Sequence, residues 1–559
     1  MPPVTIQQAM QIAMNLHATG QLQEAEAICR QVLAYAPNDS DALHLMGVLA
    51  HQCGREEVAM DWINQAIRIN PMIGHYHNSL GEVCRALRML DQAVECYRRA
   101  MELRPDCGAW RANLGSAFLE KKQYDEAILE YQRAIQLNPQ AAGFYNNLGY
   151  ALREKGDLDG AVVALRRAVE LKPDYLSALL TLGNALWDRG DIDEAIANFR
   201  RAIRVNPSSA SAHYNLSTAL QEKGEIPEAL AESDEAIRLM PDHAAAHLNR
   251  SLMLLLKGDF SAGWADYEWR RRSSVASRDC ARMGQAEWKG EGVSGRTVLI
   301  YAEQGFGDTI QFVRYAPLMA RRGGRVIVEC QPELKDLFMS VEGVQQVVAK
   351  GEALPRLDLH IPMLSLPHVF GTTLEDVPAE VPYLFPDKRR IGCWQGKLAR
   401  YGLACKVGLV WSANPKNRRI RGRSMSLCGL APLSQVQGIV FFSLQKGEAE
   451  ARAKNPPSGM NLVDLTADLK DFADTAALIT QLDLVISVDT AVAHLAGAMG
   501  KPVWTTIPFP PAWQWLLDRE DSPWYPTMRL FRQPAPGDWA SVIRRVADEL
   551  EKLVRARTE

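Results

Sequence analysis

A 34-residue period governs the first half of this chain and constrains its fold more than any other feature. Three columns of residues keep one register: a proline, a small residue and an alanine. The columns are Pro37, Pro71, Pro105, Pro139, Pro173, Pro207 and Pro241; Gly47, Gly81, Gly115, Gly149, Gly183 and Ser217; and Ala25, Ala59, Ala93, Ala127, Ala161, Ala195 and Ala229. The register stops near residue 250, and more than half of the chain still follows.

Each unit of the period reads as two short helices. In one unit, apolar residues recur at helical spacing over Tyr145–Glu154 and again over Leu158–Leu171. Lys155–Asp157 separates the two stretches. We expect the small residues where the two helices approach closely. We also expect Pro173 to stop the second helix and to begin the first helix of the next unit.

This pattern closely resembles the tetratricopeptide repeat, whose period is the same. The resemblance covers about residues 5–275, with seven regular repeats and a degenerate eighth from Asp242. It implies an α-solenoid with a concave groove that binds a protein or peptide partner. Four polar residues on first helices are candidates for that groove, where they would bond a peptide backbone, or else they form a solvated surface: Asn146, Asn147, Asn184 and Asn215.

Composition excludes several classes of protein. A chain of 559 residues with a net charge of −3 suggests several domains and no general attraction to nucleic acid. No apolar run approaches the length of a membrane span, and the N-terminus lacks the pattern of a signal peptide. The ten cysteines are scattered without a CxxC pair, which is typical of free thiols in a reducing compartment. We therefore expect a cytoplasmic protein.

Beyond Gly295 the pattern changes to short β-rich runs that alternate with helices. The sequence predicts two Rossmann-like α/β lobes, over residues 295–386 and 404–556. The first lobe would open with a strand at Thr297–Ala302, a tight loop at Gln304–Asp308 and a helix at Thr309–Arg321. Two open parallel sheets place a ligand cleft at the carboxyl ends of their strands. No GxGxxG or P-loop motif supports a dinucleotide or ATPase function.

The sharpest motif lies at the end of a hydrophobic strand. Asp489 ends that strand, Thr490 can cap the helix that follows, and His494 lies one turn into it. The N–H groups and dipole of such a first turn suit a diphosphate. The segment resembles the DTGxxH motif of the heptosyltransferases, glycosyltransferase family 9, with Ala491 in place of the usual glycine. The resemblance implies that these four residues bind a nucleotide-sugar; the alternative is a capped helix with an ordinary core histidine.

A second motif follows the first strand of the first lobe. Gly305, Gly307 and Asp308, with Pro317 further on, resemble the Gly-Asp loop of the same family. The resemblance implies that the two glycines contact the donor and that Asp308 is the catalytic base. A carboxylate at the cleft mouth can take the proton of an acceptor hydroxyl. The alternative is that Asp308 only caps the helix.

Weaker matches complete the donor lobe. The family places a hydroxyl residue and then a lysine against the phosphates, which implicates Ser412, Asn414 and Lys416, and a nucleoside contact near Gln445. A solvated basic loop is the alternative for this stretch, whose other basic residues are Arg418, Arg419, Arg421 and Arg423. Two aromatic runs, Trp513–Trp515 and Asp521–Pro526, can stack on a sugar or pack between domains.

Together these features predict a two-lobe glycosyltransferase of the GT-B type behind a repeat superhelix. It would invert the anomeric centre without a metal or other cofactor, using a nucleotide-sugar as co-substrate. By analogy with the O-linked N-acetylglucosaminyltransferase, the acceptor would be a protein hydroxyl presented by the groove. Two alternatives stay open: a sugar-nucleotide epimerase or hydrolase on the same fold, and a non-catalytic repeat scaffold with a nucleotide-binding half.

Overall fold

The computed structural model describes residues 5–272, 284–413 and 422–558. It contains two compact units, Met1–Ala219 and Leu220–Glu559. The first unit consists of repeat helices alone. The second unit contains the last repeats together with two parallel sheets. The prediction of an α-solenoid followed by two Rossmann-like lobes is confirmed.

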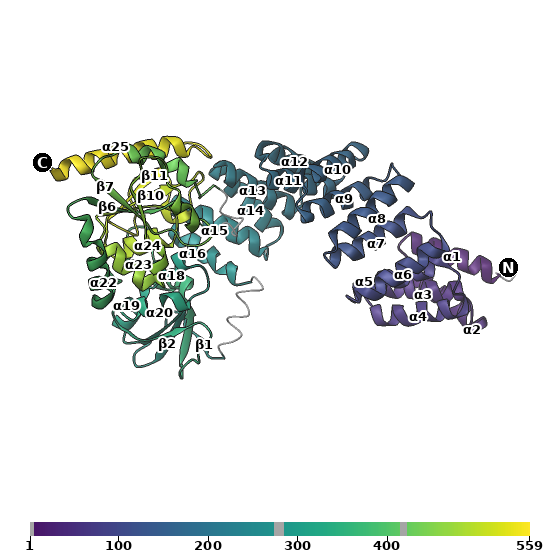
Figure 1. Ribbon diagram of the computed structural model, residues 1–559. Coiled ribbons are helices and arrows are strands. Elements are labelled where there is room, and N and C mark those ends of the chain that lie inside the picture. Colours follow the sequence, from purple (N-terminus) through teal and green to yellow (C-terminus); the bar gives the residue numbers. More distant parts are fainter. Residues whose placement is uncertain (1–4, 273–283, 414–421, 559) are drawn as a thin grey trace. The chain divides into compact units, whose positions relative to one another are not determined.

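Paired helices form the repeats, as the period predicts (Figure 1). Most of these helices have 13 or 14 residues. The helices are α1 (Ile6–Ala18), α2 (Leu22–Tyr35), α3 (Ser40–Gln52), α4 (Glu56–Ile69), α5 (Gly74–Ala86), α6 (Leu90–Leu103), α7 (Gly108–Glu120), α8 (Tyr124–Leu137), α9 (Ala142–Lys155), α10 (Leu158–Leu171), α11 (Leu176–Arg189), α12 (Ile192–Val205), α13 (Ala210–Lys223), α14 (Ile226–Leu239), α15 (Ala244–Lys257) and α16 (Phe260–Tyr267). The degenerate eighth repeat is the pair α15 and α16.

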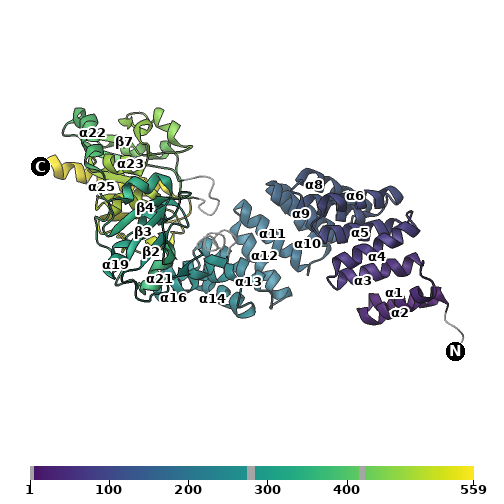
Figure 2. The ribbon, with the colours of Figure 1, turned by 90° about the horizontal axis from the view of Figure 1, so that it is seen from below.

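The small residues lie where the two helices of a pair touch. A Cβ placed on Gly81 of α5 would lie 2.6 Å from the ring of Tyr97 on α6, and one on Gly183 of α11 would lie 2.4 Å from the ring of Phe199 on α12. Both distances are shorter than any carbon contact allows. The seven alanines of the third column are fully buried. Successive pairs of the first unit lie side by side (Figure 2).

One expectation about the prolines is wrong. Pro173 does follow the end of α10 at Leu171, but α11 begins only at Leu176. The proline lies inside a turn in which the Tyr175 N–H donates to the Lys172 carbonyl at 3.1 Å. Pro173 occupies the second position of that turn, where its fixed φ is favourable. It therefore ends one helix without starting the next.

The first lobe contains a five-stranded parallel sheet in the order β1-β5-β2-β3-β4. Its strands are β1 (Ala286–Glu287), β2 (Thr297–Tyr301), β3 (Arg325–Cys330), β4 (Val344–Ala349) and β5 (Leu359–Pro362). The short β1 precedes residue 295, where the sequence placed the start of this lobe. Two residues carry no periodicity, which explains why the pattern does not reveal it.

The second lobe contains a six-stranded parallel sheet in the order β11-β10-β9-β6-β7-β8. Its strands are β6 (Cys405–Val410), β7 (Ile439–Ser443), β8 (Leu462–Asp464), β9 (Leu484–Val488), β10 (Val503–Ile507) and β11 (Met528–Arg532). The central strands are buried along their whole length. Such continuous apolar strands are typical of a parallel sheet that is covered on both faces.

The helices of the lobes are short except the last. They are α18 (Phe306–Phe312), α19 (Tyr315–Arg321), α20 (Lys335–Phe338), α21 (Leu366–Phe370), α22 (Lys388–Leu398), α23 (Phe472–Thr480), α24 (Ala491–Ala498) and α25 (Trp539–Thr558). No helix in the described part of the chain is long and apolar enough to cross a membrane. The nine cysteines of the described residues are all free thiols.

The helix expected at Thr309–Arg321 is two helices. The first, α18, begins at Phe306, and α19 begins at Tyr315 after a break at Val313 and Arg314. Pro317 explains the break. Proline has no N–H to donate, and its ring would clash with the carbonyl of Val313, four residues earlier, in a continuous helix. Asp308 consequently lies in the first turn of α18 and not in the preceding loop.

Candidate active site

Asp308 is presented by the helix that follows the central strand of the first sheet. Gly305 is the N-terminal cap of α18, and no side chain caps the helix. The Thr309 hydroxyl donates to the Gly305 carbonyl at 3.0 Å and fixes the start of the helix. The backbone N–H groups of Gly305 and Asp308 donate to the Asp308 carboxylate, so this side chain also contributes to the start of the helix, and the structural alternative stays open beside the catalytic one.

Asp489, Thr490 and His494 are presented by the helix that follows β9. Thr490 occupies the cap position of α24, but its side chain makes no capping bond. Its hydroxyl lies instead 3.0 Å from the hydroxyl of Ser487. Thr490 therefore occupies the cap position as predicted, while its hydroxyl contacts the neighbouring strand residue and not the helix.

The two motifs meet where α18 of the first lobe packs against α24 of the second. A Cβ placed on Gly307 would lie 3.0 Å from His494 Cδ2 and 3.7 Å from Ala491 Cα. Gly307 is thus required for the close approach of the two helices. Ala491 stands at this contact, in the position where the family pattern has glycine.

The electrostatic surroundings of Asp308 come from both lobes. Burial raises the pKa of Asp308 to about 6; the Arg423 guanidinium opposes this rise and the Asp489 carboxylate adds to it. Asp308 as a whole residue is nevertheless partly exposed. A carboxylate with such a pKa is ionised at neutral pH and still basic enough to accept a proton.

Asp489 is the buried anion of the site, with an exposed fraction of 5%. Arg423 Nη1 approaches its Oδ2 to 3.1 Å, and His494 Nε2 stands 3.9 Å from its Oδ1. Arg423 was predicted only as one of several basic residues of a loop. The structure assigns it a defined place beside the strand that carries Asp489.

His494 is held by two aromatic residues. Its ring is 4% exposed and stacks on Trp515 with a centroid distance of 5.1 Å. Its Nδ1 lies 3.0 Å from the hydroxyl of Tyr525. Burial lowers the pKa of His494 to about 4, and Asp489 opposes the shift. The imidazole is therefore neutral at physiological pH.

Two of the predicted donor residues after β6, Asn414 and Lys416, lie outside the described residues. The other two, Ser412 and Gln445, are described. Ser412 is partly exposed, and its hydroxyl lies 3.3 Å from that of Ser424. Gln445 is only 4% exposed. Its amide accepts from the Ser412 N–H at 2.8 Å and donates to the Ser412 carbonyl at 3.0 Å, so this side chain positions the loop and has little left for a nucleoside.

The two aromatic runs are packing residues. Trp515, Trp524 and Tyr525 are fully buried, and Trp513 is nearly so. Trp513 contacts Trp264 of the last repeat at a centroid distance of 5.2 Å. Of the two interpretations that the sequence left open, packing between domains agrees with this burial.

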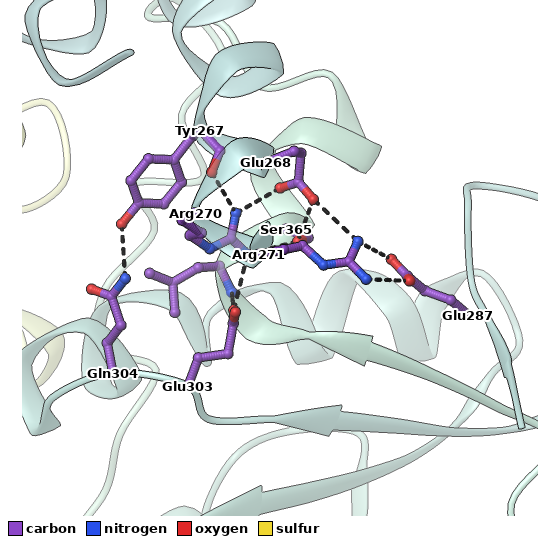
Figure 3. Close-up of polar contacts among 9 residues, drawn as sticks. Tyr267, Glu268, Arg270, Arg271, Glu287, Glu303, Gln304 and Ser365 are labelled. Atoms are coloured by element: carbon purple, nitrogen blue, oxygen red, sulfur yellow. Dashed lines mark hydrogen bonds and ion pairs between the residues drawn. The ribbon is translucent and has the colours of Figure 1, made fainter. Parts of the chain in front are cut away.

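The end of the repeat array holds the loop that precedes Gly305 (Figure 3). Arg270, only 6% exposed, donates to Glu303 at 3.0 Å and to the hydroxyl of Ser365 at 2.7 Å. Gln304 donates to the hydroxyl of Tyr267 at 3.3 Å. Burial raises the pKa of Tyr267, and Asp308 is among the charges that add to the rise. The last repeat thus reaches the surroundings of the catalytic candidate.

The four groove candidates lie on first helices, as predicted. Asn147, Asn184 and Asn215 are partly exposed, whereas Asn146 is 7% exposed and donates to Asn147 at 3.2 Å. Asn113, which was not among the predicted groove residues, lies one period before Asn147 and donates to Glu82 at 2.9 Å. The 34-residue step itself is the signal that finds it.

No group of three or more histidine, cysteine or acidic side chains that could hold a metal ion occurs in residues 5–272, 284–413 and 422–558.

Two further residues near the candidate site were not predicted from the sequence. Arg314 and Tyr383 are buried next to Tyr525. An isolated arginine or tyrosine carries no motif, and only the tertiary structure brings them to the site.

Comparison with known families agrees with this architecture. Tetratricopeptide repeat models match residues 16–81, 74–107, 180–242 and 217–268, and a TPR repeat model matches residues 115–153 and 149–190. The model of glycosyltransferase family 9, the heptosyltransferases, matches residues 430–506, which include Asp489 and His494. The first half of the chain thus matches tetratricopeptide repeats, and part of its second lobe matches the family 9 glycosyltransferases.

Among curated proteins, Protein FlbA of Caulobacter vibrioides is 30% identical over 318 residues, which are 52% of this chain and 52% of FlbA. The chain thus matches about half the length of this relative. Among solved structures, YrrB, described as a TPR protein with an unusual peptide-binding site, is 26% identical, with 33% of this chain and 95% of YrrB covered and a TM-score of 0.28. PilF of Pseudomonas aeruginosa is 20% identical, with 37% of this chain and 94% of PilF covered and a TM-score of 0.34.

Proposed function

We propose that this chain transfers a sugar from a nucleotide-sugar to a hydroxyl group of a protein, with inversion at the anomeric carbon and without a metal ion. The observation that carries the proposal is the meeting of Asp308 with the Asp489–His494 turn. The two motifs follow strands of different sheets, yet Gly307 and His494 are in contact. The carboxyl ends of parallel strands are the usual place for a ligand in such folds.

Asp308 is the general base of the proposed reaction. Its carboxylate takes the proton of the acceptor hydroxyl while the oxygen attacks the anomeric carbon. The bond from that carbon to the nucleoside diphosphate breaks, and the diphosphate leaves with the electron pair. A single displacement of this kind inverts the configuration. The raised pKa of Asp308, about 6, brings the base close to the working pH, where general base catalysis is most effective.

The diphosphate of the donor is proposed to lie at the first turn of α24. The N–H groups and the dipole of a helix N-terminus favour an anion. Arg423 adds a cationic side chain beside the same turn, 3.1 Å from Asp489. Lys416 would supply a further cation and Asn414 an amide donor; both lie outside the described residues. Positive charge here offsets the charge that develops on the leaving group.

The acceptor is proposed to be an extended peptide segment in the repeat groove. Asn147, Asn184 and Asn215 are partly exposed amides on successive repeats of the first unit. An amide side chain offers both a donor and an acceptor to a peptide backbone, whatever the sequence of that peptide. A serine or threonine hydroxyl of the bound segment would receive the sugar.

A panel of radiolabelled nucleotide-sugars tests the class of reaction. The full chain is incubated with each donor, with and without a protein extract, beside Asp308→Asn and the surface control Asp242→Asn. Label on protein bands that Asp308→Asn loses and Asp242→Asn keeps supports the proposal. Free sugar or an epimer formed without an acceptor supports a hydrolase or epimerase. Absence of binding to every donor would leave only the scaffold function.

A further inference from the structure

A buried arginine lies between the two lobes, next to the histidine of the candidate site. Arg314 stands at the break between α18 and α19 and is 4% exposed. It donates to three backbone carbonyls, of Gln311 at 2.7 Å, Trp524 at 2.8 Å and Pro378 at 3.1 Å, and to the Tyr383 hydroxyl at 2.9 Å. Its guanidinium also lies over the rings of Tyr383 and Tyr525, both with a centroid distance of 4.7 Å.

Tyr525 connects this arginine to His494. Its hydroxyl lies 3.0 Å from His494 Nδ1, while Arg314 lies over its ring and donates to the carbonyl of the preceding residue, Trp524. The neighbouring Tyr383 hydroxyl accepts from Arg314 at 2.9 Å and donates to the Ile310 carbonyl at 3.0 Å, so the hydrogen of Tyr383 is directed away from Tyr525. Arg314 thus holds both tyrosines in place.

The direction of the bond between Tyr525 and His494 Nδ1 depends on which ring nitrogen of His494 carries the hydrogen. If the hydrogen is on Nε2, Nδ1 accepts from the phenol. The surroundings of Nε2 select this arrangement. Nε2 stands 3.9 Å from Asp489 Oδ1, and a lone pair facing that carboxylate would be repelled, whereas an N–H is attracted. At 3.9 Å this contact is too long for a hydrogen bond and leaves the hydrogen for a ligand.

We propose that Arg314 and Tyr525 are positioning residues that hold His494 as its neutral Nε2–H tautomer, ready to donate a hydrogen bond to an anionic oxygen of a diphosphate. The identity of that ligand rests on the proposed function, but the tautomer does not. Asp489, Arg423 and Arg314 are the charged groups around the ring. Arg314 comes from the first lobe, so the donor side of the second lobe is complete only when the two lobes are packed together.

Nuclear magnetic resonance of the full chain with ¹⁵N-labelled histidine measures the tautomer directly. His494→Gln identifies the signal of His494. Between pH 6 and 8 the proposal predicts an unprotonated Nδ1 and a protonated Nε2. In Tyr525→Phe, which keeps the ring and loses the hydroxyl, the signals should move toward a mixture of tautomers. In Tyr383→Phe, which removes a hydroxyl of the same cluster that does not contact His494, they should not move.

Titration with inorganic pyrophosphate supplies the second readout. Tyr525→Phe should weaken pyrophosphate binding by about fivefold to tenfold, the worth of one misdirected hydrogen bond. A wild-type His494 that carries its hydrogen on Nδ1, or that is charged at pH 7, would overturn the inference. So would a Tyr525→Phe variant that changes neither the tautomer nor the binding. A correct tautomer in a protein that transfers no sugar would refute the proposed function alone.

Discussion

At the scale of single residues, the chemistry depends on how one carboxylate is surrounded. Two side chains of the second lobe act on the pKa of Asp308: the buried carboxylate of Asp489 and the cationic guanidinium of Arg423. Neither of these residues is near Asp308 in the sequence. Burial raises the pKa of Asp308 to about 6 in these surroundings, which suits the proposed role as a base. Three predictions follow from these contacts.

The first concerns pH. A base must be ionised, so kcat/KM for sugar transfer should be constant above about pH 7 and should fall as the pH decreases through about 6, the pKa of Asp308. An unperturbed aspartate would lose activity only near pH 4. Initial rates between pH 4.5 and 8.5 measure the profile. A midpoint near pH 4 in the wild-type protein would show that Asp308 is not the titrating base.

The second concerns the contact of the two helices. Gly307→Ala places a methyl group 3.0 Å from His494 Cδ2, and the ring or α18 must move to accommodate it. Overpacking of this kind costs about 1–3 kcal/mol. The matched change Gly305→Ala meets its nearest atom only at 3.7 Å and should cost less. Thermal unfolding of both variants compares the two positions; equal losses would contradict the packing of Gly307 on His494.

The third concerns metals. Because Arg423 and the first turn of α24 are proposed to balance the charge of the leaving group, transfer should proceed at an unchanged rate in excess EDTA. Arg423→Gln should lower kcat on the order of a hundredfold, as the loss of an electrostatic contact in the transition state does. Arg423→Lys should retain part of the rate. Loss of activity in EDTA that Mg²⁺ restores would contradict this account.

At the scale of the elements, the decisive structure is the segment that joins the last repeat to the first lobe. Arg270 is buried among Glu268, Glu303 and Ser365 (Figure 3). The neighbouring Arg271 pairs with Glu287 at a more exposed position. The ion pair of Arg270 with Glu303 holds the backbone just before Gly305. The ion pair of Arg271 with Glu287 lies further from the site.

Replacement of the two arginines should separate these roles. Arg270→Ala leaves buried carboxylates without their cation and should destabilise the junction by about 3 kcal/mol or more. Arg271→Ala should cost ~1 kcal/mol or less, the usual worth of an exposed pair. Hydrogen exchange of the peptide around residues 300–312 should accelerate strongly in Arg270→Ala alone. Similar exchange in both variants would show that Arg270 does not hold the loop.

The sequence predicts the elements well wherever they are long and periodic. The 34-residue columns and the buried strand β9 follow directly from hydrophobic spacing and packing of small residues. The split of α18 from α19 and the two-residue β1 do not, because a proline effect and a very short strand leave no periodic signal. At the site, motifs reveal Asp308 and His494. Tyr525 and Arg314 act through contacts between lobes, which no local pattern encodes.

At the scale of the whole molecule, the end of the repeats does not coincide with the division between the two compact units. The last repeats, from α14 to α16, belong to the same compact unit as both sheets. Phe260 of α16 stacks on Trp524 of the second lobe at a centroid distance of 6.0 Å, and Trp264 packs edge-to-face on Trp513 at 5.2 Å. The repeat array therefore ends as a structural part of the unit that holds both sheets.

The central claim is that sugar transfer takes place at Asp308, between the two lobes. The most direct test is the initial rate of label transfer to protein by the full chain, compared with Asp308→Asn and with Asp242→Asn at the turn before α15. The account predicts a loss of about a hundredfold to ten-thousandfold in Asp308→Asn, the usual contribution of a general base, with the donor still bound. It predicts no loss in Asp242→Asn. Undiminished transfer by Asp308→Asn would contradict it.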